Sequence, residues 1–165
     1  MTASGIARGR KTGVLAGLLI WVCACDEGDL FGPDLGPTVG PEHGGVLLEL
    51  SYPDDTAAGE SVPFRITLTN IGSEPYTIED PQFDVYLLDG SGKVLWNFLY
   101  GNVIIGGVPH PIPPGETYVF DISWELNRNE SGTVSGGDYL VFSVFYPLFP
   151  PALVSETRSI TILGE

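Results

Sequence analysis

The sequence predicts an all-β fold, an antiparallel β-sandwich of about seven to nine strands. Between residues 46 and 165, apolar and polar residues alternate in short runs rich in β-branched and aromatic side chains, which is typical of half-buried strands. Glycine (22 residues) and proline (14 residues) are frequent and separate these runs as turns. No stretch has a helical repeat of useful length. This spacing favours a sandwich of the immunoglobulin-like kind.

Residues 1–24 are predicted to be a secretory signal that is cleaved from the mature chain. A basic start precedes a short apolar run, Val14–Val22, that is too short to span a bilayer as a stable anchor. The run ends in Val22-Cys23-Ala24-Cys25, which resembles a bacterial lipobox. The resemblance implies that the Cys25 thiol carries a diacylglycerol. Acyl chains such as palmitate then anchor Cys25 in a membrane of the bacterial cell envelope, on the extracytoplasmic side.

Two alternatives remain open at this cysteine. The first is that Cys23 is the lipidated residue, although it fits the pattern worse because bulky Trp21 and Val22 precede it. The second is an ordinary secreted protein in which the two cysteines are incidental. After cleavage Cys25 is the single cysteine, so it cannot form an internal disulfide. Lipidation explains why the mature chain has this single cysteine. Each buried methylene contributes about 0.8 kcal/mol, so two or three acyl chains anchor stably.

The charge of the chain disfavours one class of partner. The sequence contains 7 basic and 21 acidic residues, for a net charge of −14. Cleavage before Cys25 removes three basic residues and no acidic one, which brings the net charge to −17. Nucleic acids and anionic lipid headgroups are bound by clustered Lys and Arg. We therefore expect no nucleic acid partner, while basic proteins and divalent cations remain open as partners.

Residues 25–45 are predicted to be a disordered tether between the lipid and the folded domain. The segment DEGDLFGPDLGPTVGPEHGG is rich in Gly, Pro and acid, and it cannot bury enough apolar surface to offset its ordering entropy. His43 is expected to be solvated there. The folded domain is then residues 46–165, which are enough to build a hydrophobic core.

The expected strands are spread along the whole domain. Residues 62–70 (VPFRITLTN) show the alternation best, with Phe64, Ile66 and Leu68 facing inward. Asn70-Ile71-Gly72-Ser73 closes that strand as a turn. The full set of expected strands is 46–52, 62–70, 76–79, 82–88, 94–98, 116–124, 138–146 and 153–163.

A hairpin is predicted over residues 82–98 (QFDVYLLDGSGKVLWNF). Asp89-Gly90-Ser91-Gly92 supplies the positive-φ residues of a tight turn. A phosphate-binding loop is disfavoured, because no Ser or Thr follows Lys93 and no helix is expected. Both strands are apolar on both faces, which favours a central position in a sheet. Trp96 and Trp124 are expected in the core, and stacking of either on a ligand is the alternative.

No recognisable motif brings catalytic or metal-binding residue types together. There is no G-x-S-x-G elbow, and His110 is the one histidine in the predicted domain. We therefore expect no enzyme activity, no catalytic residues, no cofactor and no metal site. Calcium at the acidic groups Asp54-Asp55, Glu79-Asp80 and Asp26-Glu27 with Asp29 is the alternative, although no D-x-[DN]-x-[DN]-G loop is present.

Four segments in a fixed order carry a family resemblance, over roughly half of the chain. They are LTNIGSEPYTI, FDVYLLDGSGKVLWNF, IPPGETYVFDISWELN and GGDYLVFSVF. Their order resembles the BsuPI-type proteinase-inhibitor domain, a bacterial immunoglobulin-like fold. The resemblance implies a sandwich of that kind and, as one function, inhibition of a protease.

One end of the predicted sandwich gathers the candidate binding residues. If consecutive strands are antiparallel, the loops 71–81, 99–115 and 147–152 share an end. Loops on a rigid scaffold often carry function, and exposed apolar clusters mark partner sites. The candidate binding residues are Val103, Ile104, Ile105, His110, Leu148 and Phe149. The alternative is that residues 103–105 cap the core or form a further short strand.

Two functions are therefore considered. The first is a membrane-anchored, extracytoplasmic lipoprotein that displays a non-catalytic protein-interaction module to an unknown protein partner. The alternative is a proteinase inhibitor that acts through the apolar loop 99–115.

Overall fold

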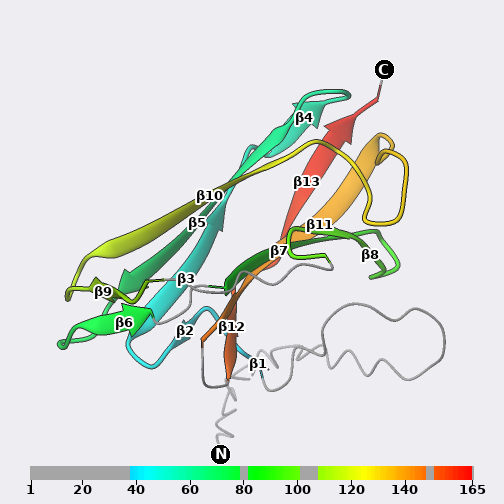
Figure 1. Ribbon diagram of the computed structural model, residues 1–165. Coiled ribbons are helices and arrows are strands. Elements are labelled where there is room, and N and C mark those ends of the chain that lie inside the picture. Colours follow the sequence, from blue (N-terminus) through cyan, green and yellow to red (C-terminus); the bar gives the residue numbers. More distant parts are fainter. Residues whose placement is uncertain (1–37, 79–81, 101–107, 148–150, 165) are drawn as a thin grey trace, which may run out of the picture. The chain divides into compact units, whose positions relative to one another are not determined.

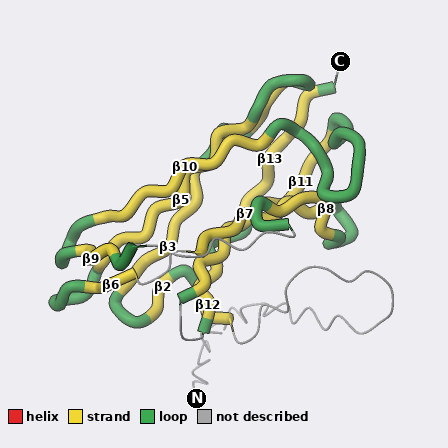
Figure 2. Tube along the Cα trace, viewed as in Figure 1, coloured by secondary structure: helices red, strands yellow, loops and turns green. Residues whose placement is uncertain are grey.

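Strands and loops make up the described structure. The computed structural model describes residues 38–78, 82–100, 108–147 and 151–164, and these contain thirteen strands and no helix (Figure 2). In these ranges, accordingly, there is no helix with the length and hydropathy of a membrane span. The prediction of an all-β fold is confirmed.

One layer of the sandwich is a four-stranded sheet in the order β10-β5-β3-β2 (Figure 1). All of its pairings are antiparallel, with Leu48 opposite Leu68 and Phe120 opposite Ile66. Inward apolar residues alternate with outward polar ones along its long strands, as the sequence predicts. The strands are β2 (Glu42–His43), β3 (Val46–Ser51), β5 (Val62–Asn70) and β10 (Thr117–Trp124).

The other layer is a larger sheet built around β11 (Gly137–Tyr146). β7 pairs along one edge of β11, and β8 follows beyond β7. β12 and β13 share the other edge of β11, and they pair in parallel with β1 and β4, respectively. These strands are β1 (Thr38–Val39), β4 (Asp55–Ala57), β7 (Gln82–Leu88), β8 (Val94–Asn97), β12 (Ala152–Val154) and β13 (Arg158–Leu163).

The inward faces of the two sheets form one hydrophobic core. The Phe64 ring stacks on Trp96 at 6.1 Å and on Trp124 at 6.3 Å, and the centroids of the two indoles are 5.4 Å apart. Trp96 is 8% exposed and Trp124 1%. The indole N–H of Trp124 donates to the Asn127 carbonyl at 2.9 Å, so burial leaves it satisfied. Both tryptophans are therefore core residues, as predicted.

The hairpin turn between β7 and β8 forms as predicted. The Asp89 Oδ1 atom accepts from the backbone N–H of Ser91 at 2.8 Å and of Lys93 at 3.1 Å. Hydrogen bonds from Ser91 hold the pKa of the Asp89 carboxyl below its ordinary value. Gly92 has a φ of 84°, a left-handed conformation in which other residues are strained. The turn is therefore built from its own residues.

Only one strand of the hairpin, β7, is central in the sheet. β8 lies at the edge, which corrects the expectation that both strands are central. β7 pairs with both β11 and β8, whereas β8 pairs with β7 alone. The outward apolar residues of the hairpin pack instead into a second cluster on the outer face of the larger sheet, around Tyr86, Val144 and Ala152. Apolar residues on both faces thus indicated burial of the hairpin, but not its number of partner strands.

Within the described residues, strand pairing is present from Thr38 onward, before the predicted domain start at Val46. β1 and β2 lie within the segment that was expected to be a tether, and β2 places the exposed His43 opposite Val46. A two-residue strand uses only the backbone groups of an existing edge, so it carries no alternation from which to predict it. The rest of that segment, residues 25–37 with Cys25, and residues 1–24 lie outside the described residues.

Candidate functional site

The strand register brings several loop attachments to one end of the sandwich, here called the loop end. β5 ends where β10 begins, with Thr69 opposite Thr117. β11 ends where β7 begins, with Tyr146 opposite Gln82. β6 and β9 lie beside the ends of β5 and β10 (Figure 1). The loops that follow β5, β8 and β11 all connect to this end, as the sequence predicts.

His110 is the one candidate binding residue that falls in the described ranges. It is the exposed first residue of β9 (His110–Ile112), and its ring centroid lies 5.0 Å from that of Tyr118. Tyr118 in turn stacks on Phe83 of the opposite sheet at 5.8 Å. His110 therefore lies on an aromatic stack that joins the two layers. Val103, Ile104, Ile105, Leu148 and Phe149 lie outside the described residues.

Asn70 holds the loop end together from within. Its side chain is buried, and its Nδ2 atom donates to the carbonyls of Glu74 and Ile112, both at 2.8 Å. Its Oδ1 atom accepts from the Gly72 N–H at 2.9 Å, and its backbone N–H donates to the Glu116 carbonyl. One residue thus connects the turn after β5, the end of β9 and the turn before β10. From the sequence, Asn70 was identified only as a turn residue.

A small separate sheet of β6 (Tyr76–Ile78) and β9 fixes part of the loop 99–115. Ile78 lies opposite His110 in an antiparallel pair. Ile78 and Ile112 are each 2% exposed and belong to the main core, whereas His110 and Pro111 are exposed. The short strand expected at 76–79 is confirmed over Tyr76–Ile78, and Glu79 lies outside the described residues. Pairing with it holds β9 extended, with His110 and Pro111 facing solvent.

Half of the exposed large apolar side chains of the described residues lie in the loops of this end. Six large hydrophobic side chains are exposed among the described residues, and three of them are Ile71 (46%), Tyr100 (39%) and Val108 (83%). Ile71 follows β5, Tyr100 follows β8 and Val108 precedes β9. Burying such surface against a partner contributes about 25 cal/mol per Å². The loop end therefore has apolar surface that a partner can cover.

A buried carboxylate fixes the segment that leads from β8 toward the loop end. The Asp84 side chain has no exposed surface. Its Oδ1 atom accepts from the N–H groups of Val85 (2.9 Å) and Leu99 (3.0 Å), and its Oδ2 atom accepts from Asn97 Nδ2 (2.8 Å). Asn129, from the β10–β11 connection, donates to Asn97 Oδ1 at 2.7 Å. Burial raises the pKa of Asp84 above its ordinary value, although the donors oppose the shift.

The role of Asp84 was not predicted from the sequence, which indicated only a strand at residues 82–88 that is apolar on both faces. The available signal was a single acid in a strand that is apolar on both faces. Beside it, the hydroxyls of Tyr86 and Tyr146 are 2.8 Å apart. Burial raises the pKa of both, that of Tyr146 to about 12, so both are protonated near neutral pH. Asp84 therefore positions the backbone at Val85 and Leu99, and the two tyrosine hydroxyls form a hydrogen bond with each other.

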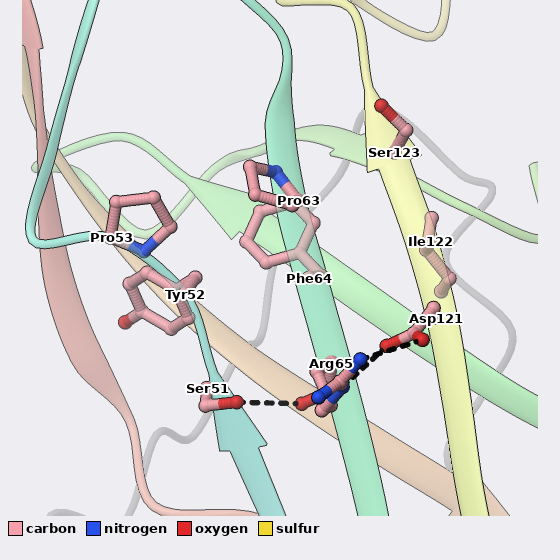
Figure 3. Close-up of a pocket in the computed structure, with 9 residues that line it drawn as sticks. All are labelled: Ser51, Tyr52, Pro53, Pro63, Phe64, Arg65, Asp121, Ile122 and Ser123. Atoms are coloured by element: carbon pink, nitrogen blue, oxygen red, sulfur yellow. Dashed lines mark hydrogen bonds and ion pairs between the residues drawn. The ribbon is translucent and has the colours of Figure 1, made fainter.

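A shallow depression of about 680 Å³ lies on the smaller sheet, away from the loop end (Figure 3). Arg65 and Asp121 face each other across it, and the Arg65 Nε and Nη2 atoms donate to the two carboxylate oxygens at 2.8 and 3.0 Å. These are the two charged side chains among its lining residues, and each neutralises the other. The depression therefore offers no uncompensated charge to a ligand.

The acidic pairs considered for calcium form no cluster in the described structure. Asp54 accepts from the Arg158 guanidinium at 3.0 Å, and Asp55 begins β4. Glu79 and Asp80 lie outside the described residues, as do Asp26, Glu27 and Asp29. In the described ranges, no three His, Cys, Asp or Glu side chains are grouped so that they could hold a metal ion.

Comparisons with known proteins support the fold. No family model matches the chain, and no curated protein does. The sporulation control protein Spo0M from Bacillus subtilis is similar over 74% of this chain and 51% of its own, with 14% identity and a TM-score of 0.50. The C-terminal domain of wzt matches 74% of this chain and 76% of its own, with 13% identity and a TM-score of 0.49.

An archaeal domain gives a match of similar extent. The CARDB domain of a Pyrococcus furiosus protein covers 73% of this chain and 94% of its own, with 15% identity and a TM-score of 0.46. At these identities the similarity concerns the fold alone. The described strands form an immunoglobulin-like β-sandwich, as the sequence predicts.

Proposed function

We propose that this chain is a membrane-anchored, extracytoplasmic lipoprotein whose β-sandwich is a non-catalytic module that binds another protein at the loop end. The observation that carries the proposal is the exposure of Ile71, Tyr100 and Val108 in the loops of one end. Exposed apolar side chains in loops of one end are candidates for a partner site, because soluble domains otherwise limit such exposure.

The framework beneath these residues supports the same role. Asn70 and Asp84 fix the loop attachments through buried hydrogen bonds. Tyr118 stacks on Phe83 of the opposite sheet, and the His110 ring contacts Tyr118 edge-on. When the binding surface is already fixed, little conformational entropy is lost in ordering it as a partner binds. The loop end is therefore suited to recognition rather than to chemistry.

The lipobox supports the location of the module. Acylation at Cys25 would hold the mature chain at a membrane of the cell envelope. A net charge of −17 disfavours close contact with anionic headgroups. We therefore expect the sandwich to bind proteins rather than lipid.

A proteinase inhibitor is the second candidate, and β9 favours it. Val108 to Pro111 is exposed, and pairing of β9 with β6 holds its backbone extended. An exposed, extended segment is the conformation in which a peptide enters a binding groove, although Pro109 and Pro111 have no N–H group to donate to it. The sequence resemblance to BsuPI-type domains points in the same direction. Inhibition of serine proteases by the full chain at micromolar concentration would support this candidate, and full protease activity would remove it.

Site-specific crosslinking tests the loop end. A photoreactive amino acid replaces Val108 in the full chain in its native envelope, and the matched control replaces Leu163, which is 47% exposed and ends β13 away from the loop end. Crosslinking to one protein from position 108 and not from 163 is the expected result. Loss of that crosslink with Ile71→Ser would map the surface, and the pair Ile104→Ser and Ile105→Ser tests the predicted site outside the described residues. Equal crosslinking from both positions contradicts the proposal.

Metabolic labelling with a palmitate analogue tests the anchor. We expect label on the wild-type chain and none on Cys25→Ser, which should also leave the membrane fraction. Cys23→Ser is the matched control and should keep the label. Retention of label by Cys25→Ser would exclude Cys25 as the lipidated residue.

A further inference from the structure

β10 is a long strand edge without a described partner. It pairs with β5 through all eight of its residues and ends the order of the smaller sheet (Figure 1). In an antiparallel strand, the backbone groups of successive residues point alternately to the two sides. Since the Asn70 N–H donates to the Glu116 carbonyl, the even-numbered residues of β10 face β5. The N–H and C=O groups of the odd-numbered residues, from Thr117 to Ser123, therefore point to the open edge.

The other edges of the described sheets are shorter or covered. β2 has two residues and β4 has three. β8 has four, and its edge is occupied by the β10–β11 connection: Asn97 N–H donates to Asn129 Oδ1, and Asn129 N–H donates to the Leu95 carbonyl. Natural sheets protect long edges with proline, lysine or bulges. β10 has none of these between Thr117 and Trp124.

The side chains along this edge leave apolar surface on both faces of the strand. Tyr118 and Phe120 point inward, toward Phe83, yet both are only half-buried. Ile122 and Trp124, at the other end of β10, are buried. On the outward face Val119 is 47% exposed. A strand added beside β10 would cover Val119 and those parts of the two aromatic rings that His110 and Phe98 leave exposed.

The charge along the edge selects the partner. Glu116, Asp121 and Glu125 are exposed, and no basic residue occurs between Lys93 and Arg128. Asp121 is paired with Arg65, which leaves two uncompensated carboxylates that flank the strand. A second copy of this chain would bring the same acidic residues to the edge and be repelled, whereas lysine or arginine would be attracted.

We propose that the open edge of β10 binds an extended, lysine- or arginine-containing segment of another protein, which adds to the smaller sheet as a further strand. Main-chain hydrogen bonds to the odd-numbered residues supply the binding, and Glu116 and Glu125 select basic segments. The edge begins at the loop end, where Tyr118 contacts His110, and continues along β10 to Trp124. The inference extends the proposed function and rests on the backbone of β10, not on the exposure of Ile71 or Val108.

Peptide titration of the isotope-labelled full chain in detergent tests the proposal. The probe is an eight-residue peptide of alternating Lys and Val, and the matched peptide has Glu in place of Lys. We expect the Lys peptide to shift the amide resonances of β10 and to slow hydrogen exchange at Thr117, Val119, Asp121 and Ser123. The Glu peptide should bind at least about tenfold more weakly, and added salt should reduce the difference.

Variants of the edge test the backbone mechanism. Val119→Pro removes a donor that β5 does not use, so the sheet should remain intact while the peptide binds about tenfold or more weakly. Val119→Thr keeps the N–H group and should bind as the wild type does. Ser123→Pro, which also removes an outward N–H, gives the same test if Val119→Pro fails to fold.

Four results would overturn the proposal. They are no binding of the Lys peptide at about 1 mM, equal binding of the two peptides, wild-type affinity in both proline variants, and a dimer of the chain that the proline variants dissociate. The last would make a second copy the occupant of the edge. A crosslink from position 108 without peptide binding at β10 would refute this inference alone, and the reverse would refute the loop-end proposal alone.

Discussion

Replacement of Asp84 by asparagine tests whether the buried carboxylate holds the β8 segment. Asp84→Asn keeps the shape of the side chain, and its oxygen can still accept from the Val85 and Leu99 N–H groups. The new amide nitrogen, however, takes the place of the Oδ2 atom that accepts from Asn97 Nδ2. Two donors then face each other in a site with no exposed surface at position 84.

The expected loss follows from these contacts. A buried donor without an acceptor costs about 1–3 kcal/mol, and hydrogen bonds to a charged acceptor exceed neutral ones by about 1 kcal/mol each. Burial of the charged carboxylate is itself unfavourable, which is why the pKa of Asp84 is raised. The uncharged asparagine avoids this penalty, and that offsets part of the cost. We expect the free energy of unfolding to fall by about 2 kcal/mol at pH 7. Adding Asn97→Asp should recover about half of the loss or more, because the carboxylate at position 97 then accepts from the amide at position 84.

The pH dependence has a definite sign. The pKa of Asp84 is higher in the folded chain than in the unfolded chain, where it is about 3.9. The stability that this group contributes is therefore fully present below pH of about 3.9, and it is lost as the pH rises through the folded pKa. The difference in stability between the wild type and Asp84→Asn should narrow as the pH rises from about 4 to 7.

Urea unfolding followed by tryptophan fluorescence measures both effects, because Trp96 and Trp124 are buried in the core. If the stability difference between the wild type and Asp84→Asn instead widens with rising pH, the hydrogen-bond donors around Asp84 outweigh its burial and its pKa is lowered. An unchanged free energy in the single variant, or no recovery in the double variant, would refute the assigned hydrogen-bond network. The other carboxylates are common to all variants and cancel in the comparison.

Three further substitutions probe other parts of the fold. Asn70→Ala removes three side-chain hydrogen bonds at the loop end and should lower the free energy of unfolding by about 2–4 kcal/mol, measured in urea. Gly92→Ala forces alanine to a φ of 84° and should cost about 1–2 kcal/mol by thermal unfolding, with native spectra retained. Arg65→Ala breaks an ion pair with Asp121 whose side chains are 60% and 59% exposed, so the loss should be below about 1 kcal/mol and smaller still in high salt. A loss above that range for Arg65→Ala would contradict its assignment as a surface pair.

The strands that alternate could be predicted, because their pattern reports one buried face directly. Phe64, Ile66 and Leu68 are all at most 1% exposed, as their spacing indicated. The Asp89 turn was also predictable, since its hydrogen bonds connect residues at most four positions apart. Local periodicity and local turn chemistry are the two signals that a single sequence contains without knowledge of its partners.

The parts that were not predicted depend on distant residues. The acceptor role of Asp84 requires Asn97 and Leu99 to return to it from the next strand, and Asn70 requires Ile112, 42 positions away. β1, β2 and β9 exist because an edge offers backbone groups, and their own side chains do not alternate. Of the candidate site, the sequence placed the loops at the correct end, but the exposure of Ile71 and Val108 depends on which loop residues the core leaves uncovered.

The two ends of the sandwich are consequently stabilised in different ways. The glycine turn closes on itself through Asp89, so a change there affects one hairpin. At the loop end the chain leaves the sheets, and its backbone groups there have no neighbouring strand to bond. The side chains of Asn70 and Asp84 bond these groups instead, and each connects several segments. A substitution at either residue releases every segment that it binds, including those that carry the exposed apolar residues. The loop end should therefore lose partner binding through changes at buried Asn70 or Asp84 as readily as through changes at its surface, whereas the turn at Gly92 should tolerate substitution without affecting binding.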